Sequence, residues 1–155
     1  MLDSDILDLF GPTIQRVIPL SDEDGGYCLL KGVVPPGVIV PLHAHPDRET
    51  FYVLVGQLEA LKGDSWHTLQ VGDVFDVPGG VRHAFRNLEN QSVSILIVTT
   101  TSLTRFLLKI GRPIANAPPG PPSSEVLQRF AQASLAEGHW LGSVSDNAKV
   151  GISFN

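Results

Sequence analysis

Short apolar segments, several of them alternating with polar residues, follow one another closely through the middle of the chain. Each has the length of a β-strand, and glycine, proline or acidic residues separate it from the next. Short strands at such even spacing, with no helical pattern among them, predict an all-β fold built as an antiparallel barrel or sandwich. The predicted strands are 13–18, 27–34, 49–55, 57–62, 66–70, 73–77, 81–86 and 93–100.

Apolar residues at helical spacing flank this region on both sides. Residues 2–10 predict one short helix with its apolar side chains on one face. Leu103, Phe106, Leu107 and Ile110 predict a second helix, with Thr101 or Ser102 available as its cap and Gly111 to end it. A third helix is predicted to start at Ser123 or Ser124 and to end at Gly138. A proline-rich connector over 113–122 separates the two, and we expect it to contain no helix.

In the last residues of the chain, the apolar positions alternate with other residues and no longer follow helical spacing. Val150, Ile152 and Phe154 alternate as in an edge strand. Such a strand would pair with the barrel or with another copy of the chain. An apolar edge without a partner therefore favours a homodimer.

Composition and charge narrow the classes of function. A chain of 155 residues fits one domain. The net charge of -5 and the absence of a lysine or arginine cluster argue against a nucleic-acid partner. Cys28 is the only cysteine, so no intrachain disulfide forms, and we expect it to be a buried apolar residue. Without a signal peptide or an apolar run of membrane length, we expect a soluble cytoplasmic protein with no membrane partner.

Candidate chemistry is concentrated first in the stretch 37–56. Alternate residues of an extended chain face one side, so His43 and His45 project together. Glu49 keeps the same parity beyond the turn that follows them. Two imidazoles and a carboxylate are good ligands for a divalent transition ion, and they would be an odd group to bury with nothing between them.

A second stretch, 72–87, supplies a further ligand. A proline followed by two glycines predicts a sharp corner that presents His83 on the next strand, opposite the first three ligands. Four protein ligands leave one or two positions open on a five- or six-coordinate ion, which indicates a catalytic rather than a structural site. The donor set suits Fe, Mn, Ni, Co, Cu or Zn, and the order of affinities does not choose among them.

Glu49 has two open roles, as a metal ligand or as a general base beside the ion. A carboxylate bound to a cation is held ionised, whereas a detached one in an apolar pocket has its pKa raised toward the useful range. Our hypothesis is that Glu49 is a ligand at rest and accepts a proton when substrate displaces it. Glu49 is therefore the candidate catalytic residue.

These two stretches resemble the two sequence motifs of the cupin family, G-x5-H-x-H-x3-E-x6-G and G-x5-P-x-G-x2-H-x3-N. The resemblance implies a double-stranded β-helix, the cupin jelly-roll barrel, over about 13–100 of a single cupin domain that spans 1–155. The C-terminal helical extension and tail, about 101–155, look like those of small bacterial cupins related to quercetin dioxygenase. Cupin barrels commonly pair, which also favours a homodimer. The matched residues are Gly37, His43, His45, Glu49 and Gly56, then Gly72, Pro78, Gly80, His83 and Asn87; the implied ligands are His43, His45, Glu49 and His83.

Other conspicuous residues have structural interpretations. His67 and His139 fall outside the ligand pattern, and we expect both to be structural. The motif glycines and Pro78 shape turns. We expect the Asn87 amide to bond backbone groups near the end of its strand.

Strand parity also predicts the lining of a substrate pocket. The lining is apolar and has no inward cation, which disfavours phosphorylated sugars and suits a small aromatic or enolic substrate. The resemblance implies a dioxygenase-type oxidoreductase. A metal-assisted isomerase, decarboxylase or lyase and a non-catalytic small-molecule-binding cupin are the alternatives. The predicted lining residues are Phe51, Val53, Phe75 and Phe85, with Tyr27 at the mouth.

Overall fold

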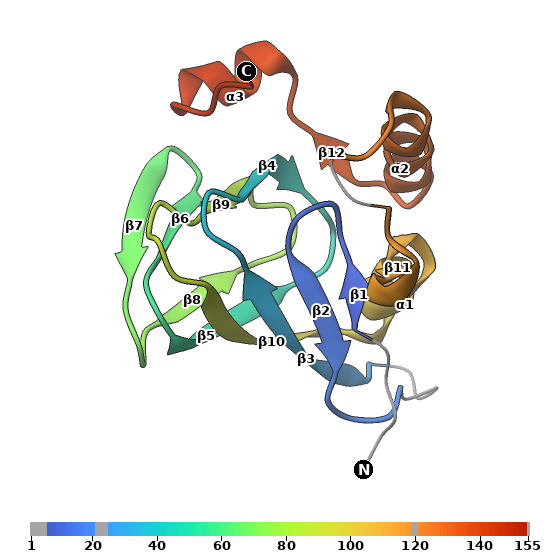
Figure 1. Cartoon of the computed structure of the whole chain (residues 1–155), viewed down its shortest axis with the longest axis horizontal. Coiled ribbons are helices and arrows are strands. Elements are labelled where there is room, and N and C mark those ends of the chain that lie inside the picture. Colours follow the sequence, from blue (N-terminus) through green and yellow to red (C-terminus); the bar gives the residue numbers. More distant parts are fainter. Residues whose placement is uncertain (1–5, 21–24, 119–120, 155) are drawn as a thin grey trace.

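The computed structural model of the chain describes residues 6–20, 25–118 and 121–154, and Figure 1 shows two antiparallel sheets with helices beside them. Within these residues one sheet has the strand order β11-β1-β2-β3-β10-β5-β8 and the other the order β12-β4-β9-β6-β7. The predicted β fold with short helices near the C-terminus is confirmed. The strands are β1 (Leu7–Asp8), β2 (Thr13–Arg16), β3 (Tyr27–Val34), β4 (Ile39–Ala44), β5 (Glu49–Val55), β6 (Leu58–Lys62), β7 (Ser65–Leu69), β8 (Val74–Val77), β9 (His83–Arg86), β10 (Val93–Thr100), β11 (Arg112–Pro113) and β12 (Trp140–Leu141).

Alternating burial along the two longest strands builds the barrel core. β3 and β10 pair along their whole lengths, and every second residue of each is buried. Full burial of one apolar side chain contributes roughly 1.5–3 kcal/mol. Gly32 sits where a Cβ atom would lie 3.0 Å from Ile95 Cγ1, so the tight packing of the sheet leaves no room for a side chain there. The core residues with 0% exposure include Cys28, Leu30, Val53, Leu58, Val77 and Val93, which confirms the buried role of Cys28.

The N-terminal segment is a strand and not the predicted helix. Leu7–Asp8 forms β1 and pairs with both β2 and β11. Phe10 has a φ of 64°, a left-handed conformation that interrupts any helix. The two pairings leave Leu7 only 8% exposed, and this tertiary gain outweighs the local helical pattern. Residues 1–5 of the predicted helix lie outside the described residues.

The helices α1 (Thr101–Ile110) and α2 (Ser124–Ala136) lie where the sequence predicts them. Each begins at a hydroxyl cap. Ser123 Oγ, one of the two predicted caps, accepts a hydrogen bond from Val126 N, whereas α1 is capped by Thr100, whose Oγ1 accepts from Leu103 N, and not by the predicted Thr101 or Ser102. The connector between them does contain one 3-10 turn, η1 (Ile114–Asn116), contrary to our expectation. Across the described ranges, no helix is long and apolar enough to cross a lipid bilayer.

The tail after α2 forms the short strand β12 and the helix α3 (Val144–Lys149), as Figure 1 shows. The edge strand predicted over 150–154 is therefore wrong. Ser143 and Asp146 form a reciprocal capping box that starts α3, and this polar signal overrides the alternating pattern beside it.

Ile152 and Asn147 hold the tail against the barrel of its own chain. The Oδ1 atom of Asn147 accepts a hydrogen bond of 2.9 Å from Leu42 N on β4. Ile152 is 1% exposed and packs in a small second core with Leu42, Leu61 and Ala84. Because this side chain is buried within the chain, the tail no longer supports the homodimer, which stays a prediction.

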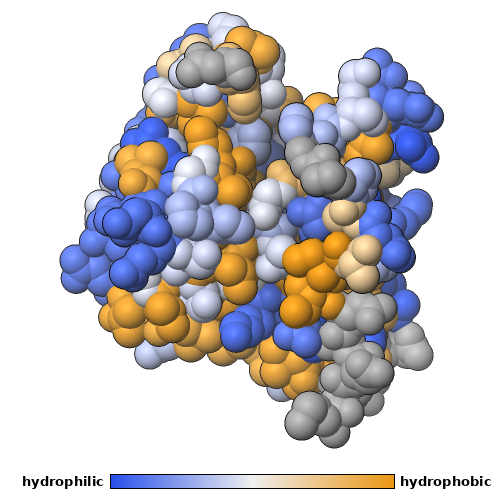
Figure 2. All heavy atoms as spheres, in the orientation of Figure 1, coloured by the Kyte–Doolittle hydropathy of each residue, from blue (hydrophilic) through white to orange (hydrophobic). Residues whose placement is uncertain are grey.

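Apolar side chains are exposed instead along the β5 and β8 edge of the larger sheet. Figure 2 shows apolar residues gathered along the lower edge of the molecule, over β5 and β8 of Figure 1. Exposed residues here include Tyr52, Val55, Val71 and Val74.

We expect Ile152→Ala to lower the free energy of unfolding by about 2–4 kcal/mol, because it leaves a cavity between the tail and the barrel. Val144→Ala, on the exposed side of α3, should change it by less than about 0.5 kcal/mol. Urea denaturation of the two variants makes the comparison. Equal stabilities for the two would contradict the packing described for the tail.

Candidate metal centre

Strand pairing brings the three motif histidines together. His43 on β4 is the register partner of His83 on β9, and His45 lies two residues beyond His43 on the same face. One ring nitrogen from each lies within 4.8 Å of the others. The ring centroids of His43 and His83 are 4.2 Å apart, and those of His45 and His83 are 5.0 Å apart.

The loops that carry these residues are in direct contact. Gly80 N donates a hydrogen bond of 2.8 Å to His45 O. At Gly79 a Cβ atom would lie 2.2 Å from Pro46 O, so only glycine allows the two loops to approach this closely. The contact fixes the position of His45 relative to His83.

Backbone hydrogen bonds set the tautomer of all three imidazoles. The Nδ1 atoms of His43, His45 and His83 lie 2.7, 2.8 and 2.9 Å from carbonyl oxygens of Pro41, Asp47 and Val81. A carbonyl oxygen only accepts, so each Nδ1 carries the proton and donates it. The Nε2 atom of each ring therefore presents a lone pair, which is the form that binds a metal ion.

Burial keeps these rings neutral. Desolvation lowers the pKa of His43 to about 4 and the pKa of His83 to about 2, and it also lowers the pKa of His45. The backbone hydrogen bonds oppose these shifts, and repulsion between the neighbouring imidazoles adds to them. His83 Nε2 is buried and has no hydrogen-bond partner among the described residues. An unpaired buried nitrogen of this kind is consistent with a metal ligand.

Glu49, the first residue of β5, is 8% exposed and lies beside two of the rings. Its carboxylate oxygens are 3.6 Å from His45 Nε2 and 3.9 Å from His83 Nε2. Because the rings are neutral, these approaches are neither ion pairs nor hydrogen bonds. Burial, and next the charge of Asp47, raises the pKa of Glu49 to about 8. A carboxylate and lone pairs that face one another at this spacing fit a divalent transition ion.

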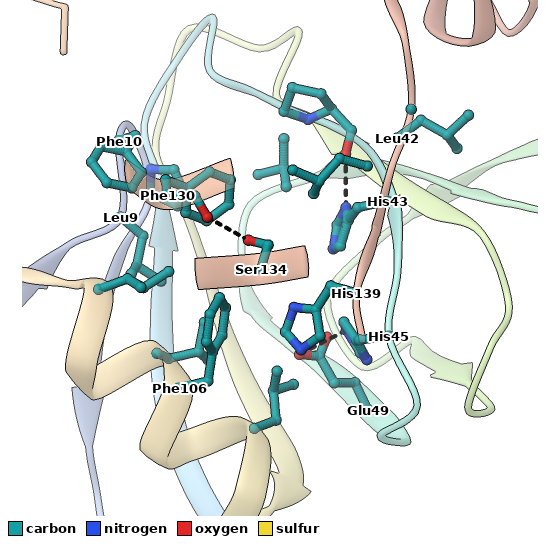
Figure 3. A pocket seen from close by; sticks show the side chains of 18 of the residues that line it. Leu9, Phe10, Leu42, His43, His45, Glu49, Phe106, Phe130, Ser134 and His139 are labelled. Carbon is teal, nitrogen blue, oxygen red and sulfur yellow. Dashed lines mark hydrogen bonds and ion pairs between the residues drawn. The ribbon is translucent and has the colours of Figure 1, made fainter. Parts of the chain in front are cut away.

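An apolar cavity of about 340 Å³ opens on one side of the histidines. Its walls come from β4, β12, α1, α2 and the residues before β2, and Figure 3 shows its aromatic and aliphatic side chains next to His43, His45 and Glu49. The described lining includes no lysine or arginine. Apolar lining residues include Leu9, Phe10, Leu42, Leu103, Phe106, Leu107, Ile110, Phe130 and Leu141.

The side chains predicted to line a pocket lie elsewhere. Phe51, Val53, Phe75 and Phe85 are at most 6% exposed and fill the barrel core, where the ring centroids of Phe51 and Phe85 are 4.7 Å apart. Tyr27 is 62% exposed. None of the five lines the cavity. Parity correctly places the four core residues inward, but close packing leaves no space for a ligand among them.

His139, expected to be structural, is the residue at the site that sequence reasoning missed. It follows α2, lines the cavity, and has its ring centroid 5.5 Å from that of His45. Nothing in its local sequence marks it, because only the pairing of β12 with β4 brings it there. In contrast, Asn87 has the expected structural role, since its Nδ2 donates to Val34 O and Gln91 O.

The comparisons with known proteins agree with this geometry. Residues 31–99 match the sequence model of the cupin domain family. The chain therefore contains a cupin domain. Over 101 residues it is 30% identical to quercetin 2,3-dioxygenase of Bacillus subtilis, an alignment that spans 63% of this chain and 30% of that protein. The cupin chain thus corresponds to less than a third of the length of this relative.

Two solved structures share the fold of this cupin. An RmlC-like cupin from Shewanella frigidimarina superposes with a TM-score of 0.57 at 20% identity, covering 67% of this chain and 89% of that one. The polyketide cyclase RemF from Streptomyces resistomycificus superposes with a TM-score of 0.56 at 21% identity, covering 63% and 73%. At such identities the likeness shows the double-stranded β-helix alone.

We expect the protein to bind one equivalent of Zn²⁺ or Co²⁺ and His83→Ala to weaken this binding by on the order of 100-fold or more, since losing a ligand costs at least as much as losing a residue that orients one. His67→Ala, on the exposed face of β7, is the matched control and should bind as the wild type does. Calorimetric titration of chelator-treated protein measures both. Unchanged affinity in His83→Ala would contradict the metal centre.

For the metal-free protein we expect the free energy of unfolding to fall as pH drops below about 6.5. The histidines of the unfolded chain accept protons near their ordinary pKa of 6.5. In the folded chain the pKa of His43 is about 4 and that of His83 about 2, so the unfolded chain binds more protons in this range. Glu49 acts in the opposite direction, because the folded chain keeps until about pH 8 a proton that the unfolded chain releases near 4.5. Stability should therefore also fall as pH rises between these values.

Urea denaturation from pH 4 to pH 9 in the presence of a chelator checks both slopes. Glu49→Gln should remove the fall in stability between pH 6.5 and pH 8, by more than about 1 kcal/mol. It should also steepen the fall between pH 6.5 and pH 4.5, where protonation of Glu49 opposes the effect of the histidines. His67→Gln should keep both. A Glu49→Gln variant that retains the alkaline fall would show that another group causes it.

Proposed function

We propose that this cupin is a metal-dependent, dioxygenase-type oxidoreductase that acts on a small aromatic or enolic substrate. The observation that carries the proposal is the cluster of three neutral imidazoles, two of which, His43 and His45, line an apolar cavity together with Glu49. The similarity to quercetin 2,3-dioxygenase supports this choice among the chemistries that the fold hosts.

The four polar side chains have distinct roles in this proposal. His43, His45 and His83 hold a divalent transition ion through their Nε2 atoms, with Glu49 as a fourth ligand or as a base beside it. When bound, such an ion supplies Lewis-acid and redox chemistry toward oxygen atoms. The backbone carbonyls that accept from each Nδ1 keep the imidazoles in the ligand tautomer throughout.

Glu49 accepts a proton from the substrate in this proposal. Its carboxylate lines the cavity, so a substrate hydroxyl that reaches the histidines also reaches a carboxylate oxygen of Glu49. A carboxylate whose pKa burial raises to about 8 accepts a proton more readily than an exposed one, and a nearby cation would favour its ionised form.

The apolar wall selects the rest of the substrate. Leu103, Phe106 and Leu141 contact the space next to the histidines and exclude water from it. A cavity whose described lining lacks lysine and arginine offers nothing to neutralise a phosphate or carboxylate group. This composition favours an uncharged aromatic or enolic molecule.

A metal-assisted isomerase, decarboxylase or lyase is the second candidate. The buried, protonatable Glu49 favours it, since these reactions need a proton to be moved between substrate atoms and need no oxygen. Turnover under strictly anaerobic conditions would separate this candidate from the first.

We expect the protein reconstituted with Fe, Mn, Ni, Co, Cu or Zn in turn to consume oxygen with at least one of these metals when offered polyphenol or enediol substrates. Glu49→Gln should lower the rate by about 10²–10⁴-fold, because it removes the proton acceptor. An oxygen electrode measures the uptake, with His67→Gln as the control. No uptake with any of the six metals would refute the dioxygenase proposal.

A further inference from the structure

His139 lies at the metal end of the cavity, although it belongs to neither motif and falls outside the matched cupin domain. Its ring meets Phe106 edge to face, with centroids 4.4 Å apart, and its centroid is 5.5 Å from that of His45. Figure 3 shows the ring beside Glu49 and His45, on the side that faces the cavity. A ligand that reaches the motif histidines therefore passes this ring.

The backbone holds His139 firmly in this place. Gly138, with a φ of 79°, ends α2, and His139 N donates a hydrogen bond of 2.9 Å to Ser134 O. The next two residues form β12, which pairs with β4 through Trp140↔Ala44 and Leu141↔His43. Because β4 also carries His43, the strand register fixes the two histidines relative to each other.

The other polar side chains of the cavity wall, outside the proposed ligands, are already occupied. Ser134 Oγ donates to Phe130 O at 2.8 Å. Asn147 accepts from Leu42 N and donates to two carbonyl oxygens of the loop before α3. Among the described residues, neither ring nitrogen of His139 takes part in a hydrogen bond. His139 is thus the polar group of the described wall that has bonding capacity left for a ligand.

The rest of the cavity defines the chemistry of that ligand. The cavity has a volume of about 340 Å³, which suits a small molecule, and its other lining side chains are mainly aromatic or aliphatic. A half-buried imidazole nitrogen without a partner in such a wall favours any ligand that supplies one hydrogen-bonding group at that point. The complementary molecule has an apolar body and a hydroxyl or carbonyl group at one end.

We propose that His139 hydrogen-bonds the single polar group of a largely apolar substrate and so turns this group toward His43, His45, Glu49 and His83. The assignment rests on the proposed function for the identity of the site. It requires no change in the charge of His139, because a neutral imidazole has one donor and one acceptor nitrogen and can meet either a hydroxyl or a carbonyl group. The C-terminal extension thus supplies a residue that selects and orients the substrate.

The test compares two probes of nearly equal size, 2-naphthol and 2-methylnaphthalene, which differ in one hydroxyl group. Zinc-loaded protein is used so that no oxygen chemistry takes place, and the fluorescence of the naphthalene ring follows binding. His139→Phe should weaken binding of 2-naphthol about tenfold and change that of 2-methylnaphthalene less than about twofold. His139→Gln, which keeps a donor and an acceptor, should recover most of the affinity for 2-naphthol. Should His139→Phe fail to fold, His139→Leu replaces it.

Zinc content and thermal melting of each variant exclude indirect effects, and His67→Phe serves as the matched control. Equal loss of both probes in His139→Phe, loss of zinc, or failure of the wild type to bind either probe would overturn the assignment. The selective loss of 2-naphthol binding in His139→Phe is measured independently of oxygen uptake. If the protein consumes no oxygen but shows this selective loss, the role of His139 stands and the dioxygenase proposal fails. If it consumes oxygen without the selective loss, only the role of His139 fails.

Discussion

The close contact between two loops is the constraint on which the site depends. Gly79 leaves space for Pro46 O, and Gly80 N bonds to His45 O, so the loop after β4 and the loop before β9 lie against each other. His45 in the first loop and His83 directly after the second are thereby held close together. Any side chain at position 79 would separate the loops, and the rings with them, because a Cβ atom and a carbonyl oxygen cannot approach to 2.2 Å.

Burial favours the neutral form of every ionisable side chain at the site. Desolvation pushes the imidazoles toward their neutral form and also pushes Glu49 toward its neutral, protonated form. Without a cation the site therefore holds lone pairs that face one another and a carboxylic acid at 3.6 Å, too far for a good hydrogen bond. A divalent ion would satisfy the lone pairs of the three histidines together.

The space for a ligand comes from the C-terminal extension. Large aromatic side chains such as Phe51 and Phe85 fill the barrel, so the barrel by itself offers a ligand little room. α1, α2 and β12 form one side of the cavity, and β4 and the residues before β2 form the other. The barrel thus supplies the three motif histidines, and the extension supplies much of the apolar wall and His139. Differences in such extensions are one way in which a single barrel can serve several chemistries.

The sequence by itself determined the features that depend on short-range geometry. Strand parity is a property of the extended backbone, so His43 and His45 could be placed on one face from their spacing, and α1 and α2 could be placed from their period. Glu49 lies on β5 in the other sheet, so strand pairing and not parity brings it to the histidines. The proline and the two glycines that precede His83 pointed to this residue, and the structure brings it to His43 and His45.

Only the tertiary structure decided the features that depend on long-range pairing. Leu7 follows a helical pattern but pairs with two strands, and Ile152 follows a strand pattern but fills a small core behind a capped helix. Phe75 faces inward as parity requires, yet it packs among core side chains and does not line the cavity. His139 reaches the site because residues far apart in the chain, on β12 and β4, share hydrogen bonds. Local sequence carries no record of such partners, since the free energy that selects them comes from burial against the rest of the fold.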